Sequence, residues 1–481
     1  MSDSPSDAFA SVRKALCVVS CLVGTLSLWA CRSGSSRPIE THTAAPAALP
    51  APVPAASTPT AVVPNLVTSD LESAIRRHID TTIAAHGGLF PIEFEGKELR
   101  LKLVRVHTEY LSTVGENLHF ACVDLATTQG DVYDVDFFLR GTEKDAVVTE
   151  TMVHKLNGQP YYVWEQGADE HWERRTPDLS KPALLGVVHG RDEFTFTYQA
   201  TVPVLTAHAR MWVPVAQTDA FQSVTVRRIV APGSSRTITD AHEGNRVLVL
   251  DLTPADSGKT LEILYGVTRL EKSAYADTPA HAARALTPER LVPADAKFVE
   301  TAQRVTRGKA GALEKARALY DHTMEHIKYM KYGTGWGKGD AHYACDAASG
   351  NCTDFHAYFI ALCRSVNIPA RFAIGASIPA DRDEGSMDGY HCWAEFYAEG
   401  RWWPVDISEA DKYAPLAGYY FGHNPANRVE FSRGRDLVTD PLPAGGPINF
   451  LAYPLLEVPK AGAPDAWETV KVPTVFGFKR R

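Results

Sequence analysis

Between residues 350 and 406 the chain carries a cysteine, a histidine and an aspartate, each in a different local pattern. Cys352 begins a helical pattern in which apolar residues recur at helix spacing from Phe355 to Val366, before Pro369 ends it. The first turn of a helix presents unpaired N–H groups and the positive end of the helix dipole. Both favour a thiolate over a thiol, so this position predicts an activated cysteine.

His391 and Asp406 belong to two strand-like runs, residues 390–397 and 401–407, joined by a tight turn at residues 398–400. An antiparallel hairpin would place Asp406 nearly opposite His391, within reach of one ring nitrogen. A thiolate, a base and a group that orients the base are the parts needed for nucleophilic acyl transfer. The segment therefore predicts a catalytic site.

These residues resemble the transglutaminase-like superfamily, whose core holds a papain-type Cys-His-Asp arrangement in this chain order. The resemblance extends to further motifs at residues 367–372 (Asn-Ile-Pro-Ala-Arg-Phe), 419–422 (Tyr-Tyr-Phe-Gly), 427–429 (Asn-Arg-Val) and 434–437 (Gly-Arg-Asp-Leu). It covers roughly residues 290–455 closely and 195–275 loosely. It implies that Cys352 is the nucleophile, His391 the general base and then acid, and Asp406 the residue that fixes the imidazole tautomer.

Each of these residues taken singly has an ordinary structural explanation. A helical cysteine with apolar neighbours is usually a small core residue, as we expect for Cys363. A strand histidine is commonly a core or surface group, and Asp406 after Trp-Trp-Pro could cap a turn. A register that pairs the histidine with the aspartate would rarely arise by chance, so catalysis explains the set better.

The length of 481 residues predicts two or three domains. The helix and strand patterns, together with the resemblance, imply an α+β fold. The net charge of −8, from 49 basic and 57 acidic residues, argues against a nucleic-acid partner. We expect the following segments: a lipoprotein-type signal peptide (1–31), an Ala/Pro/Ser/Thr-rich disordered tether (32–64), a small α+β domain of unknown role (65–185), a β-sandwich-like domain (190–275), a transglutaminase-like (papain-like) catalytic domain (285–460) and a C-terminal tail (461–481).

The N-terminus has the pattern of an export signal. Arg13 and Lys14 precede an uncharged run, residues 15–29, which has the length of a secretory h-region and is short for a membrane span. It ends in Leu-Trp-Ala-Cys31, which resembles the bacterial lipoprotein processing site and implies lipidation of Cys31. We expect a protein lipid-anchored to the membrane on the periplasmic side of the bacterial cell envelope. An ordinary secretory signal or an uncleaved anchor would also export it.

Five cysteines follow Cys31: Cys122, Cys345, Cys352, Cys363 and Cys392. An odd number in an oxidising compartment is consistent with one reserved reactive thiol beside at most two disulfides. A Cys345–Cys392 bond stays open, because spacing does not establish connectivity. In the domain of residues 65–185, His154, Asp134 and Asp136 lie in strand-like runs, and we expect solvated strand residues there rather than ligands.

The oxyanion of the acyl-transfer step needs two hydrogen-bond donors, and the backbone N–H of Cys352 is the first. The resemblance implies an upstream aromatic or polar side chain as the second, with Trp336 our first candidate and Tyr343 the next. Alternating glycines at residues 333–339 indicate a wall of the cleft rather than a phosphate cradle. No cofactor is expected.

The expected reaction is acyl transfer on an amide bond of a protein or peptide, peptidoglycan peptides included. We favour water as acceptor, which makes the protein a peptidase or deamidase. A primary amine as acceptor would make it a cross-linking transglutaminase, and a non-catalytic envelope module with the same fold is a further alternative. A metal site at Cys352 and His356 with His391-Cys392 is disfavoured, because adjacent strand residues point to opposite faces.

Overall fold

The computed structural model describes residues 65–115, 117–142, 145–166, 172–175, 186–331, 334–387, 389–412 and 414–481. The expected signal peptide, Cys31 and the tether lie outside these residues. In the described part, no helix has both the length and the apolar character needed to cross a membrane. The fold is α+β, as the sequence predicts, with one six-stranded and three five-stranded sheets among the described residues.

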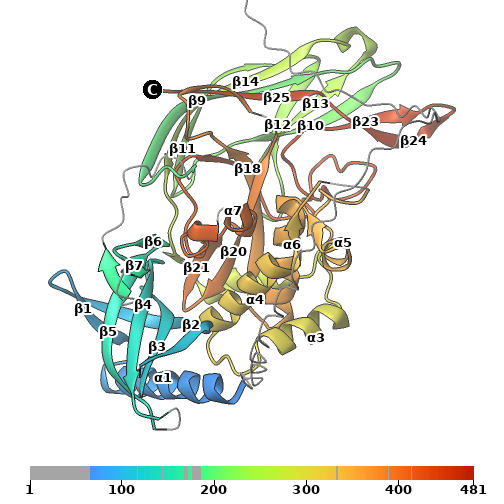
Figure 1. The fold of residues 1–481 in the computed structure, drawn as a ribbon. Helices are drawn as coiled ribbons and strands as arrows, with labels where there is room; N and C mark the ends of the chain where they lie inside the picture. Colours follow the sequence, from blue (N-terminus) through green and yellow to red (C-terminus); the bar gives the residue numbers. More distant parts are fainter. Residues whose placement is uncertain are drawn as a thin grey trace, which may run out of the picture. The chain divides into compact units, whose positions relative to one another are not determined.

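The N-terminal sheet is an antiparallel meander with one long helix, α1 (Asn65–Ala85), along one face (Figure 1). Its strands are β1 (Phe90–Phe94), β2 (Lys97–Gly115), β3 (Leu118–Ala126), β4 (Val132–Arg140), β5 (Val147–Leu156) and β6 (Gln159–Pro160), with a separate pair β7 (Val163–Gln166) and β8 (Trp172–Arg175). Leu71, Ile75 and Ile79 recur on one side of α1 and are buried against alternate residues of the sheet such as Val123 and Phe137. This alternation gives the domain its own apolar core.

The other face of this sheet is polar, and it is not solvated as the sequence suggested. Asp136 is fully buried, and Asp134 and His154 are each only 9% exposed. This face meets α4 (Ala312–His326), from which Arg317 Nη1 lies 2.9 Å from Asp124 Oδ2. A strand pattern reports which side chains share a face, but the neighbour that covers that face lies nearly two hundred residues away in the sequence.

A β-sandwich follows, built from two antiparallel five-stranded sheets (Figure 1). One sheet has the order β12-β13-β10-β23-β24 and the other β11-β14-β9-β25-β19. The strands are β9 (Arg191–Thr201), β10 (Ala209–Val215), β11 (Gln222–Val230), β12 (Ser234–Thr239), β13 (Arg246–Leu252), β14 (Thr260–Leu270), β19 (Glu384–Met387), β23 (Leu455–Lys460), β24 (Ala463–Val470) and β25 (Thr474–Arg480). Residues 461–481 are therefore not a tail: β25 pairs along β9, with Phe476 opposite Tyr198.

The third part combines helices with the sheet β15-β21-β20-β18-β22. Its elements are β15 (Tyr275–Ala276), α2 (Pro279–Ala282), α3 (Ala296–Val305), β16 (Lys328–Tyr329), α5 (Ala341–Ala347), β17 (Ser349–Gly350), α6 (Cys352–Ser365), β18 (Ala370–Ser377), β20 (His391–Ala398), β21 (Arg401–Val405), α7 (Ile407–Lys412) and β22 (Arg428–Arg433). Every residue of α6 from Cys352 to Cys363 is buried. A helix buried on all sides needs the apolar composition of this segment, and α6 lies against β18 and β20 (Figure 1).

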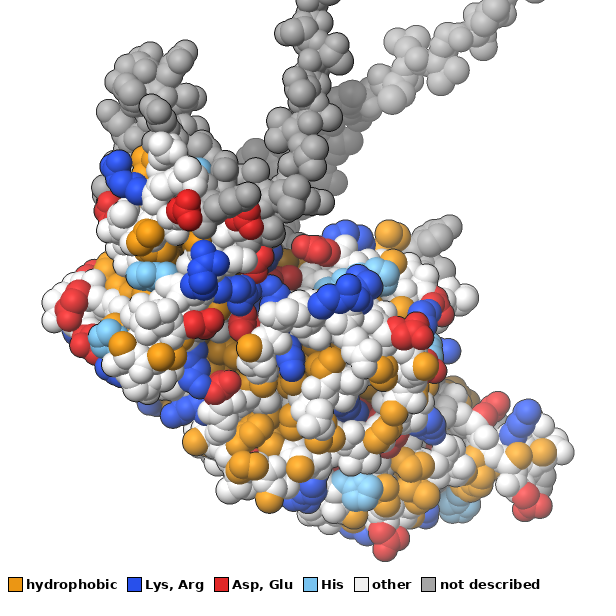
Figure 2. All heavy atoms as spheres, turned by 90° about the horizontal axis from the view of Figure 1, so that it is seen from below, with side chains coloured by type: hydrophobic (Ala, Val, Ile, Leu, Met, Phe, Trp, Pro, Cys, Tyr) orange, Lys and Arg blue, Asp and Glu red, His pale blue; other side chains and the backbone are white. Residues whose placement is uncertain are grey.

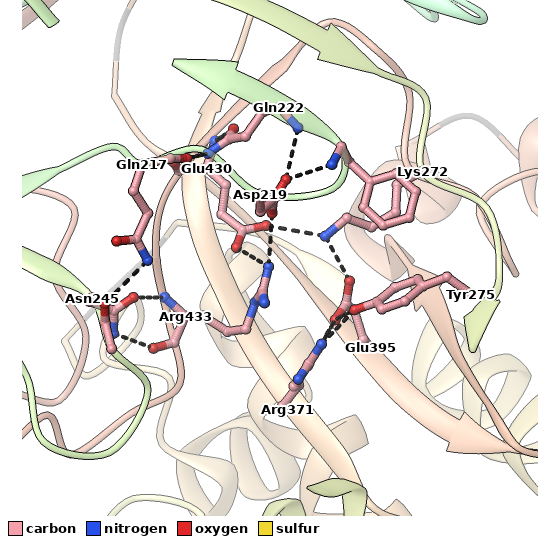
Figure 3. Close-up of polar contacts among 12 residues, drawn as sticks. Gln217, Asp219, Gln222, Asn245, Lys272, Tyr275, Arg371, Glu395, Glu430 and Arg433 are labelled. Atoms are coloured by element: carbon pink, nitrogen blue, oxygen red, sulfur yellow. Dashed lines mark hydrogen bonds and ion pairs between the residues drawn. The ribbon is translucent and has the colours of Figure 1, made fainter. Parts of the chain in front are cut away.

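A buried ionic network joins the sandwich to this sheet (Figure 3). Lys272, just after β14, is fully buried, and its Nζ lies 2.9 Å from Glu395 Oε1 and 3.4 Å from Glu430 Oε2. Arg371 Nη2 lies 2.8 Å from Glu395 Oε2, to which the Tyr275 hydroxyl also donates. Burial would raise the pKa of Glu395, but Lys272 and Arg371 hold it well below its usual value. The network therefore fixes β20, the strand that begins at the expected catalytic histidine.

The surface carries charges of mixed sign. On the face drawn in Figure 2, basic and acidic side chains lie beside one another with hydrophobic patches between them. This matches the modest net charge of −8 for 481 residues.

Candidate active site

Cys352 is the first residue of α6, and a reciprocal capping box fixes the start of this helix. Asn351 Oδ1 accepts the Thr353 N–H at 3.0 Å, and Asp354 Oδ2 accepts the Asn351 N–H at 2.9 Å. Cys352 is 2% exposed. The thiol therefore stands at the positive end of a buried helix, as the sequence predicts.

His391 and Asp406 come together through the β20–β21 hairpin. Glu399 and Gly400 form its turn with positive φ values of 54° and 75°, as a tight two-residue connection requires. Ala394 pairs with Val405, so Asp406 lies just beyond β21 and diagonally across from His391 rather than directly opposite it. The His391 Nε2 atom lies 2.6 Å from Asp406 Oδ2.

Asp406 is held as a carboxylate. It is fully buried, which would raise its pKa, but His391 and Arg428 hold that pKa below the usual range. Arg428 Nη2 lies 3.5 Å from Oδ2, while Oδ1 accepts hydrogen bonds from the Ser408 hydroxyl and the Glu409 N–H, each at 3.2 Å. A charged, fully engaged carboxylate of this kind fixes both the position and the tautomer of the imidazole.

Cys352 and His391 form a thiolate–imidazolium pair. The Cys392 thiol is the largest influence on the pKa of Cys352 and lowers it. Burial raises this pKa, and His391 lowers it again. The net result is a pKa well below the ordinary thiol value. Burial would lower the pKa of His391, but Asp406 and Cys352 raise it to about 9. The directions of the two pKa shifts favour an ionised Cys352 beside a protonated His391.

Cys392 is a neighbour of the site that the sequence reasoning missed. Adjacent strand residues were expected to point to opposite faces, yet both His391 and Cys392 lower the pKa of Cys352, and Cys392 Sγ lies 3.6 Å from His356 Nδ1. His391 is the first residue of β20, and it and Cys392 pair with Gly375 and Ile374 of β18. The Cys345–Cys392 bond, which the sequence left open, is absent, and both are free thiols in the described chain. Cys345 instead contacts Tyr358.

His356 has a structural task at the same helix. Its Nδ1 donates to the Cys352 carbonyl at 2.7 Å, and its Nε2 accepts the Ile407 N–H at 3.1 Å. Burial lowers its pKa, so the ring is neutral. His356 therefore links the first turn of α6 to the start of α7 through hydrogen bonds. Because both ring nitrogens are used in these bonds, neither can bind a metal.

The glycine-rich loop before α5 is tied to the start of α6. Asp354 accepts the N–H groups of Gly337 at 2.7 Å and Gly339 at 3.0 Å. Burial raises the pKa of this carboxyl to about 6. The only sequence signal for these bonds is the Asn-x-x-Asp capping pattern at residues 351–354.

Trp336 and Tyr343, the expected oxyanion donors, both lie near this loop. Trp336 is half-buried between Gly335 and Gly337, and the ring of Tyr343 lies so close to Gly335 that a Cβ there would be 2.7 Å from it. In the described residues, the hydrogen bonds include none from either side chain to Cys352. A polar pair at the site escaped prediction: Asn351 Nδ2 donates to the Tyr390 hydroxyl at 3.0 Å.

Comparisons with known proteins agree with this geometry. Residues 299–407, which contain Cys352, His391 and Asp406, match the family model of the Transglutaminase-like superfamily. An uncharacterized protein of Haemophilus influenzae is 24% identical over 314 residues, which cover 55% of this chain and 85% of that protein.

Two solved structures are also similar. A candidate cysteine protease of Cytophaga hutchinsonii is 16% identical and covers 60% of this chain and 98% of its own, with a TM-score of 0.42. A candidate protease of Parabacteroides distasonis is 11% identical, and the match covers 60% of this chain and 63% of that protein, with a TM-score of 0.20. On the family match, residues 299–407 of this chain are a transglutaminase-like domain.

Proposed function

We propose that this protein is a cysteine-dependent enzyme that transfers acyl groups from amide bonds through a thioester. The observation that carries the proposal is the chain of contacts from Asp406 through His391 to the buried Cys352 thiolate. Nucleophile, base and orienting group all lie within one transglutaminase-like domain.

In the first step the Cys352 thiolate attacks the carbonyl carbon of the amide. The oxyanion that forms accepts a hydrogen bond from the Cys352 backbone N–H at the start of α6, where the helix dipole also favours negative charge. Trp336 is our candidate for the second donor and Tyr343 the alternative. Loss of one such donor costs about 3 kcal/mol of transition-state stabilisation.

His391 then acts as the acid. Its imidazolium gives a proton to the nitrogen of the leaving amine as the C–N bond breaks, which leaves the acyl group on Cys352 and the imidazole neutral. The neutral ring takes a proton from the incoming acceptor, the acceptor displaces the thiolate, and the starting pair is restored. Asp406 keeps the Nε2–H in place throughout, so that Nδ1 faces the sulfur.

Water is the proposed acceptor, so the products are those of a peptidase or deamidase. Trp393, Trp402 and Trp403, which could have walled an acceptor pocket, are at most 1% exposed and serve as core. Proteins or peptides of the envelope, peptidoglycan peptides included, are the proposed substrates. This rests on the proposed export of the chain and its anchoring to the periplasmic side of the membrane through a lipid on Cys31.

The test offers the purified chain a glutamine-rich protein with and without a fluorescent primary amine. Ammonia release and amine incorporation are followed, and the acyl–Cys352 intermediate is trapped by acid quench and located by mass spectrometry. We expect ammonia or new amino termini without amine incorporation, and no turnover in Cys352→Ala. Strong amine incorporation would instead identify a cross-linking transglutaminase. An unreactive thiol and no product over a broad peptide panel would favour a non-catalytic module.

A further inference from the structure

The polar face of the N-terminal sheet gathers four metal-binding side chains from three adjacent strands. They are Cys122 of β3, Asp134 and Asp136 of β4 and His154 of β5, and their ligand atoms all lie within 4.8 Å of one another. None of the four is more than 9% exposed. The acyl-transfer mechanism uses none of them, so their convergence needs a separate explanation.

The spacing of these atoms fits a tetrahedral coordination shell. Cys122 Sγ lies 3.3 Å from Asp136 Oδ1, and His154 Nδ1 lies 3.4 Å from the same oxygen. A tetrahedral zinc ion holds sulfur at about 2.3 Å and oxygen or nitrogen at about 2.0–2.2 Å, which puts neighbouring donors roughly 3.3–3.6 Å apart. The two distances to Asp136 Oδ1 already match these separations, and the remaining ligand atoms lie within 4.8 Å of one another.

One carboxylate oxygen of the cluster, on Asp134, accepts no hydrogen bond from the described residues. Asp134 Oδ2 accepts a hydrogen bond from Lys155 Nζ at 2.8 Å, whereas its buried Oδ1 has no hydrogen-bond partner among the described residues. A buried acceptor without a hydrogen bond lowers the stability of the fold by about 1–3 kcal/mol. A carboxylate oxygen of Asp134 lies within 4.8 Å of the other three ligand atoms, and a cation among them would engage this carboxylate.

The histidine is oriented as a ligand. His154 Nε2 lies 3.0 Å from the Tyr162 carbonyl oxygen, which can only accept, so Nε2 carries the proton. Nδ1 is then the ring nitrogen that faces the Asp136 carboxylate, at 3.4 Å from Oδ1, where it could bind a cation shared with that carboxylate. The Tyr162 hydroxyl donates to the other oxygen of Asp136 at 2.7 Å, and such outer contacts are typical of metal sites.

The neighbouring groups are already committed to other partners. Asp124 lies 2.9 Å from Arg317 Nη1 and 3.1 Å from His107 Nε2, so it is paired without a metal. In the four-residue cluster a divalent ion would face two carboxylates and one thiolate, whose proton leaves to solvent on binding. Lys155 on Asp134 offsets the remaining negative charge.

We propose that Cys122, Asp134, Asp136 and His154 form a structural site for a divalent transition metal ion, with Zn²⁺ as its best match. A thiolate and an imidazole select zinc over calcium or magnesium, which prefer oxygen ligands alone. Four protein ligands close the shell, as in structural rather than catalytic zinc sites. The ion would cross-link β3, β4 and β5 beneath α4.

Co²⁺ substitution tests the site in the full-length chain. After removal of metal with a chelator, titration with CoCl₂ should give the intense visible bands of tetrahedral Co²⁺ and a near-ultraviolet thiolate-to-metal band, saturating at one ion per chain and bleached by ZnCl₂. The thiolate band should vanish in Cys122→Ser and persist in Cys352→Ser. A band that follows Cys352 instead, or no tetrahedral spectrum in the wild-type chain, would overturn the proposal.

A second measurement does not depend on how Cys122→Ser folds. Asp134→Asn keeps the shape of the side chain, and we expect it to bind Zn²⁺ at least tenfold more weakly in competition with a chromogenic chelator. The exposed Asp145→Asn is the matched control and should bind as the wild type does. ZnCl₂ should also raise the melting temperature of the metal-free wild-type chain, and the site is refuted if it neither binds Zn²⁺ nor gains stability.

Discussion

His391 turns its Nε2 atom, not Nδ1, toward Asp406, with 2.6 Å between that nitrogen and Oδ2. The diagonal register of the hairpin causes this, because Asp406 follows the last paired residue of β21. With Nε2 occupied, Nδ1 is the nitrogen that faces the Cys352 sulfur. The chemistry of the site therefore depends on a two-residue turn at Glu399 and Gly400.

Asp406→Asn should leave the fold intact and lower kcat by roughly 10²–10⁴-fold, because the amide no longer fixes the imidazole tautomer. KM should change little, since Asp406 is buried behind His391 and touches no substrate. Steady-state kinetics with the substrate identified by the ammonia assay would measure both. Glu384→Gln, an exposed carboxylate-to-amide change on β19, is the control and should retain full activity.

Cys392→Ala should raise the pKa of Cys352, because the Cys392 thiol donates the hydrogen bond that lowers it most. The acid limb of the alkylation rate should move to higher pH, measured with iodoacetamide across a pH series. Cys363→Ala is the control, because Cys363 is as buried as Cys392 and lies in α6, the helix that begins at Cys352. Among the described residues no contact between Cys363 and Cys352 is seen, so the acid limb of Cys352 alkylation should stay in place in this variant. Equal shifts in both variants would show that the effect is only loosened packing.

Lys272→Met should lower the free energy of unfolding by about 3–5 kcal/mol, because it removes the buried ammonium group that lies between the Glu395 and Glu430 carboxylates. Urea unfolding followed by tryptophan fluorescence would measure the loss. Lys259→Met is the comparison, since Lys259 pairs with Asp256 at 2.9 Å but is largely exposed. That change should cost less than about 1 kcal/mol, and similar losses in the two variants would contradict a specific role for the network.

Cys31→Ala should release the protein from the membrane fraction into soluble periplasm or leave the precursor unprocessed. Fractionation with mass spectrometry of the N-terminus would detect either outcome. Recovery of the wild-type chain from the cytoplasm with Met1 present would refute export.

The sequence predicts those parts of the site that depend on local spacing. The helix that starts at Cys352 and the hairpin that carries His391 and Asp406 both lie within sixty residues, and apolar periodicity and turn chemistry decide them. Contacts across the fold escape such reasoning. Nothing in the sequence around Phe476 signals pairing with Tyr198, so the C-terminal strands looked like a tail.

Cys392 shows a second limit of sequence reasoning. Strand alternation predicts that it points away from His391, yet both residues lower the pKa of Cys352. The buried Asp134 and Asp136 show a third limit. Their polar strand pattern predicts solvent, but the Tyr162 hydroxyl contacts Asp136, Lys155 contacts Asp134, and α4 meets the same face through Arg317 and Asp124.

The central claim is that Cys352 is an ionised nucleophile paired with a protonated His391. The most direct measurement is the rate of iodoacetamide labelling at each cysteine of the folded chain against pH, resolved by mass spectrometry. Cys352 has a lowered pKa, so its rate should stay high as pH falls far below the ordinary thiol value of 9.0 and decline only in acid. The pKa of His391 is raised to about 9, so a second change in rate should appear there as the imidazolium is lost. Labelling of Cys352 that rises only toward pH 9 would contradict the account.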